Sequence, residues 1–135
     1  MCRLALASWR NFRVSGATDT VRAIYDAYVA KDRGAAERLL ADDFRFTSPL
    51  DNGIDRDSYF EICWLNSADI EGFEIVHLLE HGEQVFVTYE GRSKRTGFRN
   101  TEILTVRDGK IAEVEVYFGW NLPHKVPAGE HRDPE

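Results

Sequence analysis

The apolar residues of this chain change their spacing once, near Asn66, and that change limits the possible fold more than any other feature. Before it they recur at the helical period, as in the stripe Val21, Ile24, Tyr25, Tyr28 and Val29. The spacing predicts three helices, at Thr18–Lys31, Gly34–Ala41 and Asp55–Ser67. After it, β-branched and aromatic residues predict four strands, at Phe73–His81, Gln84–Gly91, Phe98–Arg107 and Lys110–Trp120. Helices followed by strands indicate an α+β domain, with the helices on one face of an antiparallel sheet.

Capping and turn residues support these boundaries. Thr18 or Asp19 can cap the first helix, and Asp55 can cap the third. The pair Asp108-Gly109 between two strands is typical of a two-residue hairpin. A short extended piece, Phe44–Ser48, is expected before Pro49.

The alternation of apolar and polar residues along two of the predicted strands suggests which faces of the sheet are covered. On the last strand Val114, Val116, Phe118 and Trp120 share one face, which we expect to point to the core or a pocket. On the strand Gln84–Gly91 both faces are partly apolar. We expect one row to lie on the open face of the sheet and to pair with a second copy of the chain, namely Val85, Val87 and Tyr89, with Ile103 on the neighbouring strand.

Length and composition fit one small domain. The chain has 135 residues, which is typical of a single domain. We expect a flexible leader over residues 1–16, a pocket domain over residues 17–121 and an irregular tail over residues 122–135. No apolar run approaches the roughly 20 residues that cross a bilayer.

Charge and cysteine content exclude several partners. The net charge is −6, from 17 Lys and Arg against 23 Asp and Glu, and no basic stripe is present. Binding to nucleic acid or to an anionic membrane is therefore not expected. Cys2 and Cys63 form no disulfide framework, so a reducing, cytoplasmic location is expected.

Glu102 is the first candidate for chemistry, because it shares a strand face with Leu104 and Val106. Desolvation at such a site raises the pKa of a carboxyl group, which could then act as an acid, a base or a hydrogen-bond donor. It could equally be a strand-end glutamate that is solvated or paired with an arginine. Tyr25 and Tyr28 lie on the buried stripe of the first helix, where each could contact a ligand or bond to a backbone carbonyl.

The sequence lacks the usual signals for metals and nucleotides. His77, His81, His124 and His131 are scattered and form no ligand spacing. No Gly-rich phosphate loop and no Gly-x-Ser-x-Gly motif is present. We therefore expect neither a metal nor a cofactor.

Five segments in order carry a resemblance to a known family: Ile24–Tyr28, Ala41–Phe46, the third helix capped by Asp55, Thr101–Ile111 and Glu113–Trp120. Together they resemble the SnoaL-like branch of the nuclear transport factor 2-like superfamily, which includes polyketide cyclases and ketosteroid isomerases. The resemblance implies a cone-shaped, cystatin-like α+β barrel, in which a curved antiparallel sheet and three N-terminal helices enclose a pocket. It also implies a homodimer.

The resemblance implies roles for individual residues. Tyr25 takes the place of an oxyanion-binding tyrosine, and Glu102 that of a protonated partner acid. The isomerase base would precede Pro49, where this chain has Ser48. The cyclase aspartate would fall on the last strand at Val116.

These inferences combine into an expected function and an alternative. The expected ligand is a small, apolar, oxygenated molecule that undergoes proton transfer beside a carbonyl: isomerisation, cyclisation or dehydration. Glu102 and Tyr25 are the expected catalytic residues. The expected ligand contacts are Tyr28, Phe46, Ser48, Phe60, Trp64, Thr88, Glu90, Val114, Val116 and Trp120. The alternative is a non-catalytic ligand-binding or dimerisation module of the same fold.

Overall fold

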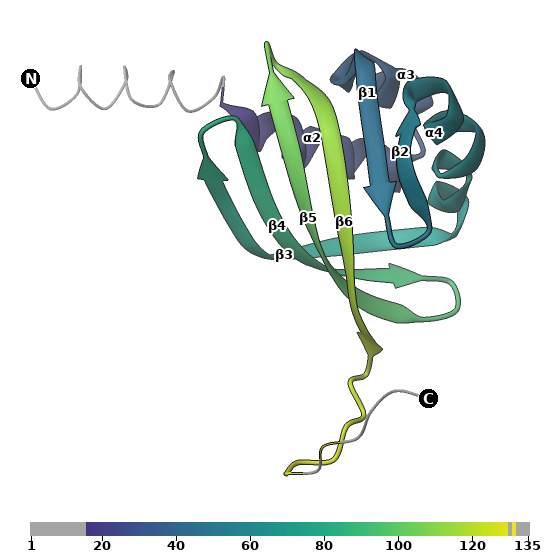
Figure 1. Cartoon of the computed structure of the whole chain (residues 1–135). Helices are drawn as coiled ribbons and strands as arrows, with labels where there is room; N and C mark the ends of the chain where they lie inside the picture. Colours follow the sequence, from purple (N-terminus) through teal and green to yellow (C-terminus); the bar gives the residue numbers. More distant parts are fainter. Residues whose placement is uncertain (1–15, 130, 132–135) are drawn as a thin grey trace, which may run out of the picture.

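The computed structural model describes residues 16–129 and residue 131. In that part of the chain the helices are α2 (Ala17–Ala30), α3 (Arg33–Leu39), α4 (Arg56–Ile62) and the 3₁₀ helix η1 (Trp64–Asp69). The strands are β1 (Leu40–Ser48), β2 (Asp51–Asp55), β3 (Ile70–His81), β4 (Gln84–Ser93), β5 (Gly97–Arg107) and β6 (Lys110–Leu122). They form one curved sheet in the order β2-β1-β6-β5-β4-β3 (Figure 1).

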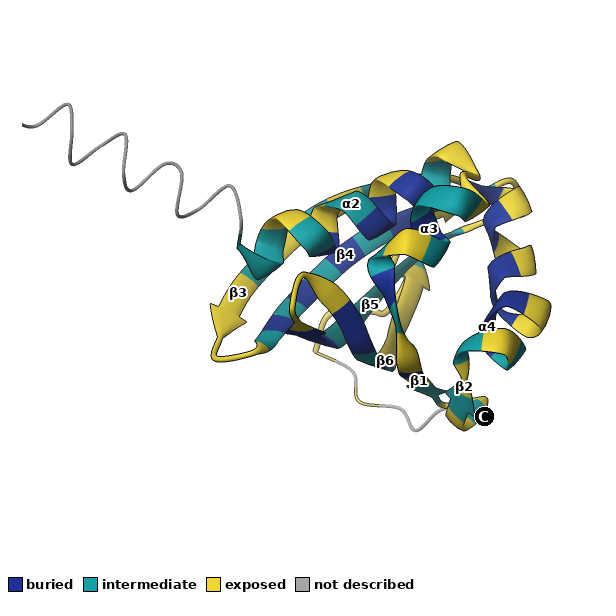
Figure 2. Ribbon diagram, turned by 90° about the horizontal axis from the view of Figure 1, so that it is seen from above, coloured by how far each residue is buried: buried dark blue, intermediate teal, exposed yellow. Residues whose placement is uncertain are grey.

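The predicted α+β class and the three α-helices are confirmed. Strands β3 to β6 form the predicted antiparallel meander, and Figure 2 shows α2 and α3 lying across one side of the curved sheet. The Asp108-Gly109 turn has positive φ at both residues, 53° and 74°, as a type I′ hairpin requires. No helix in the described part of the chain is long and apolar enough to cross a membrane.

The sheet is larger than predicted at one edge. The extended piece before Pro49 is a full strand, β1, which pairs in parallel with β6 and antiparallel with β2. The sequence hides it because Asp42 and Asp43 interrupt its apolar pattern, and both are exposed beside a register shift between Leu40 and Arg45. A register shift of this kind lets the strand turn charged residues toward solvent.

Two helix boundaries also differ from prediction. The N-cap of α2 is Gly16, which makes no side-chain cap bond, so neither Thr18 nor Asp19 caps it. Asp55 does cap α4, accepting a bond from the Ser58 amide at 2.9 Å. The third helix ends at Ile62, and the chain continues as η1. Trp64 and Ser67 are both buried there, because residues three apart share a face at three residues per turn.

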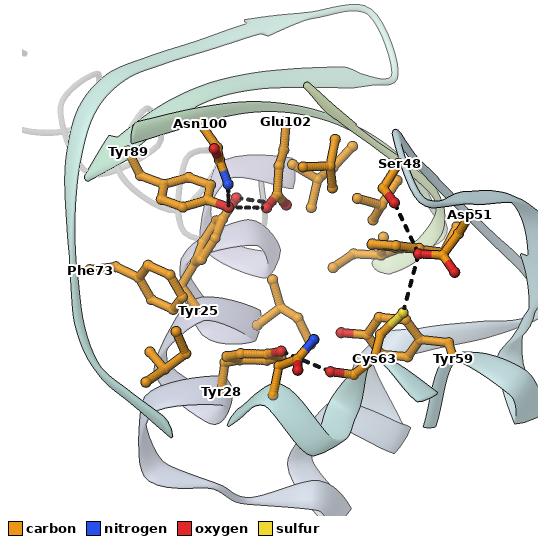
Figure 3. Close-up of a pocket in the computed structure, with 18 of the residues that line it drawn as sticks. Tyr25, Tyr28, Ser48, Asp51, Tyr59, Cys63, Phe73, Tyr89, Asn100 and Glu102 are labelled. Carbon is orange, nitrogen blue, oxygen red and sulfur yellow. Dashed lines mark hydrogen bonds between the residues drawn. The ribbon is translucent and has the colours of Figure 1, made fainter. Parts of the chain in front are cut away.

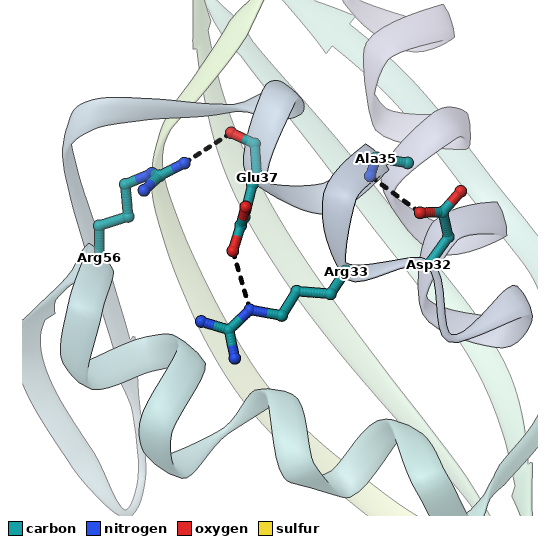
Figure 4. A network of polar contacts seen from close by, with 5 residues as sticks. All are labelled: Asp32, Arg33, Ala35, Glu37 and Arg56. Atoms are coloured by element: carbon teal, nitrogen blue, oxygen red, sulfur yellow. Dashed lines mark hydrogen bonds and ion pairs between the residues drawn. The ribbon is translucent and has the colours of Figure 1, made fainter.

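A polar network joins α3 to α4 (Figure 4). Asp32 caps α3 through the Ala35 amide at 3.0 Å. Arg33 pairs with Glu37 at 2.8 Å, and Arg56 donates to the Glu37 carbonyl oxygen at 2.7 Å. The contact from Arg56 ties α4 to α3, at the end of the molecule where β1 and β2 lie.

The prediction that Val85, Val87 and Tyr89 of β4 lie on the open face of the sheet was wrong. Val85 and Val87 are fully buried and Tyr89 is nearly so, under helix α2 and not on the open face. The pairing of Val87 with Glu102 fixes this, because directly opposed residues of antiparallel strands share a face. The open face therefore carries the other row of β4, Phe86, Thr88 and Glu90, with Ile103 beside it.

A β-bulge at Gly119 redirects the end of β6. Asn100 pairs with Phe118, whereas Arg99 pairs with Trp120, so Gly119 is the extra residue. The bulge shifts the alternation by one, and Trp120 leaves the face of Val114 and Val116. A Cβ on Gly119 would collide with the carbonyl oxygen of Arg99, so the bulge requires glycine.

We predict that Gly119→Ala destabilises the domain by about 1–3 kcal/mol, because the added methyl must displace backbone. Asn121→Ala, an exposed position two residues along the same strand, is the control and should change stability by less than about 0.5 kcal/mol. Urea denaturation of both variants measures the difference. Equal stability of the two variants would contradict the described bulge.

Candidate active site

A cavity of about 240 Å³ lies between the helices and the inner face of the sheet. Its volume is below the roughly 300–1,000 Å³ typical of sites for drug-sized ligands, so it suits a small molecule. Its walls are mostly apolar and aromatic, and its lining residues are Ile24, Tyr25, Tyr28, Leu40, Phe44, Phe46, Ser48, Leu50, Asp51, Tyr59, Cys63, Asn66, Ile70, Phe73, Tyr89, Phe98, Asn100, Glu102, Leu104, Ile111, Val114, Val116 and Phe118.

One side of the cavity carries a carboxyl group held by two phenols (Figure 3). Tyr25 from α2 donates to Glu102 Oε1 at 3.0 Å, and Tyr89 from β4 donates to Glu102 Oε2 at 2.6 Å. Asn100 in turn donates from Nδ2 to the Tyr89 hydroxyl at 3.4 Å. We call these four residues the Glu102 cluster.

Burial sets the protonation of this cluster. Desolvation raises the pKa of Glu102, and the hydrogen bonds from Tyr89 and Tyr25 lower it by less, so the net shift is upward. Part of the Glu102 side chain faces the cavity, but protein encloses it on the other sides. Burial and the nearby Glu102 charge raise the pKa values of Tyr25 and Tyr89. Both phenols therefore stay protonated and remain donors at neutral pH.

The opposite side of the cavity carries a second carboxylate (Figure 3). Ser48 Oγ donates to Asp51 Oδ2 at 2.9 Å, and Cys63 Sγ lies 3.9 Å from the same oxygen. We call these three residues the Asp51 cluster. Burial, the Asp51 charge and the contact with Asp51 raise the pKa of the Cys63 thiol to about 11, so it remains a neutral thiol.

Two further phenols reach the cavity. Tyr28 donates to the Cys63 carbonyl oxygen at 3.1 Å, which is the backbone partner that a core tyrosine commonly finds. Tyr59 points its hydroxyl into the cavity (Figure 3), and burial raises its pKa well above the ordinary value. Within the described residues the Tyr59 hydroxyl has no hydrogen-bond partner, so it is available to a ligand.

The cavity gathers seven of the residues proposed from sequence: Tyr25, Tyr28, Phe46, Ser48, Glu102, Val114 and Val116. They come from α2, β1, β5 and β6. The inward stripe of α2 and the inward rows of the strands meet there because both pack against the same core.

Phe60 and Trp64 are placed outside the cavity lining, as part of the packing behind it. Phe60 is almost fully buried, and the guanidinium groups of Arg33 and Arg56 lie over its ring at 4.9 and 5.5 Å. Trp64 packs edge-on against Tyr28, with ring centroids 5.1 Å apart. Both therefore support the wall from its outer side.

Thr88, Glu90 and Trp120 lie on the open face of the sheet, not in the cavity. Thr88 shares a hydroxyl hydrogen bond with Thr101 at 2.8 Å, and Glu90 pairs with Arg99 at 3.2 Å. Trp120 is 48% exposed and lies under the Arg99 guanidinium at 5.5 Å. Thr88 and Glu90 lie there because they belong to the outward row of β4, and Trp120 lies there because the Gly119 bulge turns it outward.

Sequence reasoning missed Tyr89, Asn100, Asp51 and Tyr59. Tyr89 and Asn100 could have been found from the β4–β5 hairpin, because any register that pairs Val87 with Glu102 also pairs Tyr89 with Asn100 on the cavity face. Asp51 lies beside a turn, where no periodic pattern marks it. In the described part of the chain, no three His, Cys, Asp or Glu side chains gather as metal ligands.

Comparison with known proteins identifies the family of this chain. The SnoaL-like domain family matches residues 21–114, well over half of the chain. This protein belongs to the SnoaL-like family. No functionally curated protein matches the sequence.

Solved structures share the fold of this SnoaL-like chain. A proposed ketosteroid isomerase from Kribbella flavida aligns with TM-score 0.66 and 19% identity, over 87% of this chain and 89% of its own. A proposed polyketide cyclase from Sinorhizobium meliloti aligns with TM-score 0.60 and 23% identity, over 73% and 94%. An NTF-2 like protein of unknown function from Burkholderia xenovorans aligns with TM-score 0.69 and 19% identity, over 82% and 87%. At such identities the likeness concerns the fold alone.

The raised pKa of Glu102 predicts a pH-dependent stability. Between the ordinary glutamate pKa of about 4.3 and the higher value in the fold, the folded state keeps a proton that the unfolded chain has released. The stability that this group contributes is therefore lost as pH rises through that window. The unfolding free energy of the wild type relative to Glu102→Gln should fall with rising pH there and then level off, as measured by urea titrations.

Glu61→Gln provides the baseline for removing a carboxyl, since Glu61 is exposed on α4. A wild-type minus Glu102→Gln difference that stays flat from about pH 4 to about pH 9 would rule out a raised carboxyl pKa.

Proposed function

We propose that this SnoaL-like protein binds a small, mostly apolar molecule through a neutral oxygen, and that it transfers a proton beside a carbonyl group. The observation that carries the proposal is the Glu102 carboxyl, bonded by Tyr25 and Tyr89 at one side of an apolar cavity. Both phenols already donate to Glu102, so the protonated carboxyl is the donor left for a ligand, and a carbonyl oxygen is an acceptor.

The lining also disfavours a charged ligand. No lysine, arginine or histidine lines the cavity in the described part of the chain. An anionic ligand would lose its hydration without gaining a cation there. The aromatic walls favour a compact, planar or ring-bearing molecule.

Donors placed in this way can support proton transfer next to a carbonyl. When a carbon beside the carbonyl loses a proton, negative charge develops on the oxygen, and preorganised donors stabilise that charge more strongly than the ground state. Isomerisation, cyclisation and dehydration all use such a step. The names of the similar structures, a proposed ketosteroid isomerase and a proposed polyketide cyclase, support this reaction class.

A non-catalytic ligand-binding module is the second candidate. It is favoured by Ser48 and Val116, which stand where the isomerase and cyclase resemblances call for an acid. Such a module would use the same donors for binding alone, so the two candidates share their ligand class and differ in turnover.

Binding of 2-naphthol, a compact neutral mimic of a ring enol, tests the ligand class. Glu102→Gln keeps both the shape and a donor, so its affinity should stay within about threefold of the wild type. Glu102→Leu removes the donor and should weaken binding by about tenfold or more, equivalent to about 1.4 kcal/mol. Naphthol fluorescence titrations measure both affinities.

Glu90→Gln is the matched control, because Glu90 is a carboxylate on the opposite face of the same sheet. It should leave naphthol affinity unchanged. Wild-type affinity in Glu102→Leu would show that the Glu102 cluster does not contact the ligand.

We also propose that the protein forms a homodimer through the open face of the sheet. That face carries apolar side chains without cover in the described chain: exposed Leu79, Tyr117 and Trp120, and partly exposed Phe86 and Ile103. Two-fold pairing would bury the same row on both copies. The row differs from the one predicted, which lies in the core.

Ile103→Glu should weaken this dimer by about tenfold or more. It places a charge between Phe86 and Glu115, in the open-face row that the dimer would bury. Sedimentation velocity across a range of concentrations measures the change. Leu65→Glu on η1, 66% exposed in the wild type, is the control and should leave association unchanged. A wild-type monomer at high micromolar concentration would contradict the dimer.

A further inference from the structure

The two polar clusters of the cavity differ in what they can do to a proton. In the Glu102 cluster the pKa of the carboxyl is raised and both phenols donate to it, so the carboxyl proton, when bound, is the one left for a ligand. The Asp51 cluster is centred on a carboxylate whose two protein partners are an uncharged hydroxyl and an uncharged thiol. Figure 3 shows the two clusters on opposite sides of the same space.

We propose that Asp51 is the proton acceptor of this cavity and that Ser48 positions it. The inference rests on the proposed function and names the base that it requires. The isomerase resemblance calls for a base at the residue before Pro49, which is Ser48, and a serine alone cannot accept a proton from carbon at neutral pH. The structure places the Asp51 carboxylate 2.9 Å from that serine hydroxyl.

Local structure holds the Asp51 carboxylate in place. Ser48 ends β1 and Asp51 begins β2, and the two residues are paired across the turn. The Ser48 hydroxyl accepts a bond from the Leu50 amide at 3.0 Å while it donates to Asp51. The hydroxyl is thus fixed by the turn and in turn fixes the carboxylate.

One carboxylate oxygen of Asp51 has no hydrogen-bond partner in the described part of the chain. Both protein contacts are made to Oδ2, and within the described residues Oδ1 makes no hydrogen bond. Asp51 is only partly buried and lines the cavity. Asp51 therefore borders the apolar space with one of its two oxygens unused.

The proposed step balances within the cavity. The carbon–hydrogen bond beside the carbonyl breaks, and the proton forms an oxygen–hydrogen bond on Asp51. The electron pair moves into a carbon–carbon double bond and the carbonyl oxygen becomes an enolate, which accepts a hydrogen bond from the protonated Glu102 carboxyl. Asp51 then returns its proton to the same or another carbon, so neither an oxidant nor a reductant is needed.

Exchange of 2-tetralone protons in deuterium oxide tests the step. This small bicyclic ketone has acidic protons beside its carbonyl, and NMR follows their loss. Asp51→Asn should slow the protein-catalysed exchange by about 100-fold or more, while 2-naphthol affinity changes by less than about threefold. Asp43→Asn, an exposed aspartate on β1, should leave both unchanged.

Ser48 variants test the positioning role. Ser48→Ala should slow exchange by about tenfold without loss of naphthol affinity, and Ser48→Thr should restore the rate because it keeps the hydroxyl. If Asp51→Asn melts below the assay temperature, Asp51→Glu carries the test: it keeps the charge but moves the carboxylate, so exchange should still slow with binding intact.

The two readouts separate the possible failures. Suppose that naphthol binds but that tetralone exchange is no faster than in buffer, or that neither Asp51 variant slows it. Either result would overturn the role of Asp51 and leave the proposed ligand class standing. Failure of Ser48→Thr to restore the rate would overturn the role of Ser48. Absence of naphthol binding in the wild type would overturn both the ligand class and the inference.

Discussion

The Glu102 carboxyl depends on a balance between burial and hydrogen bonding, and the rest of the site depends on that balance. Desolvation favours the neutral acid, whereas the phenols of Tyr25 and Tyr89 favour the charged form. Burial has the larger effect, so the group keeps its proton to higher pH than an ordinary glutamate. The phenols fix its orientation without supplying the positive charge that would hold it ionised.

The fold supplies this arrangement from three separate elements. Tyr25 comes from the inward stripe of α2, Tyr89 from β4 and Glu102 from β5. Ring contacts among Tyr25, Tyr89 and Phe73, with centroids 5.1 to 5.4 Å apart, hold the two phenols in place. The curvature of the sheet leaves room beside them, and the β1–β2 turn closes the other side with Asp51.

The sequence identified the elements whose periods are regular. Tyr25 and Glu102 were found because a helical stripe and a strand alternation each point them inward. Tyr89 was assigned to the wrong face because both rows of β4 are partly apolar, and only pairing with β5 decides between them. Trp120 was misplaced because a single bulge residue, Gly119, inverts the alternation without changing composition. Asp51 acquires its position from a turn and from contact with Cys63, twelve residues further along the chain, which local pattern cannot reveal.

The most direct measurement is the titration of the Glu102 carboxyl itself. Carbon-13 labelling of glutamate side chains, with Glu102→Gln to assign the signal, gives the pKa by NMR. We expect the midpoint clearly above the ordinary glutamate value of about 4.3, and we expect Tyr89→Phe to raise it further because a bond that favours the charged form is removed. A midpoint at the ordinary value would contradict the account, since Glu102 would then be ionised at neutral pH and could not donate to a carbonyl oxygen.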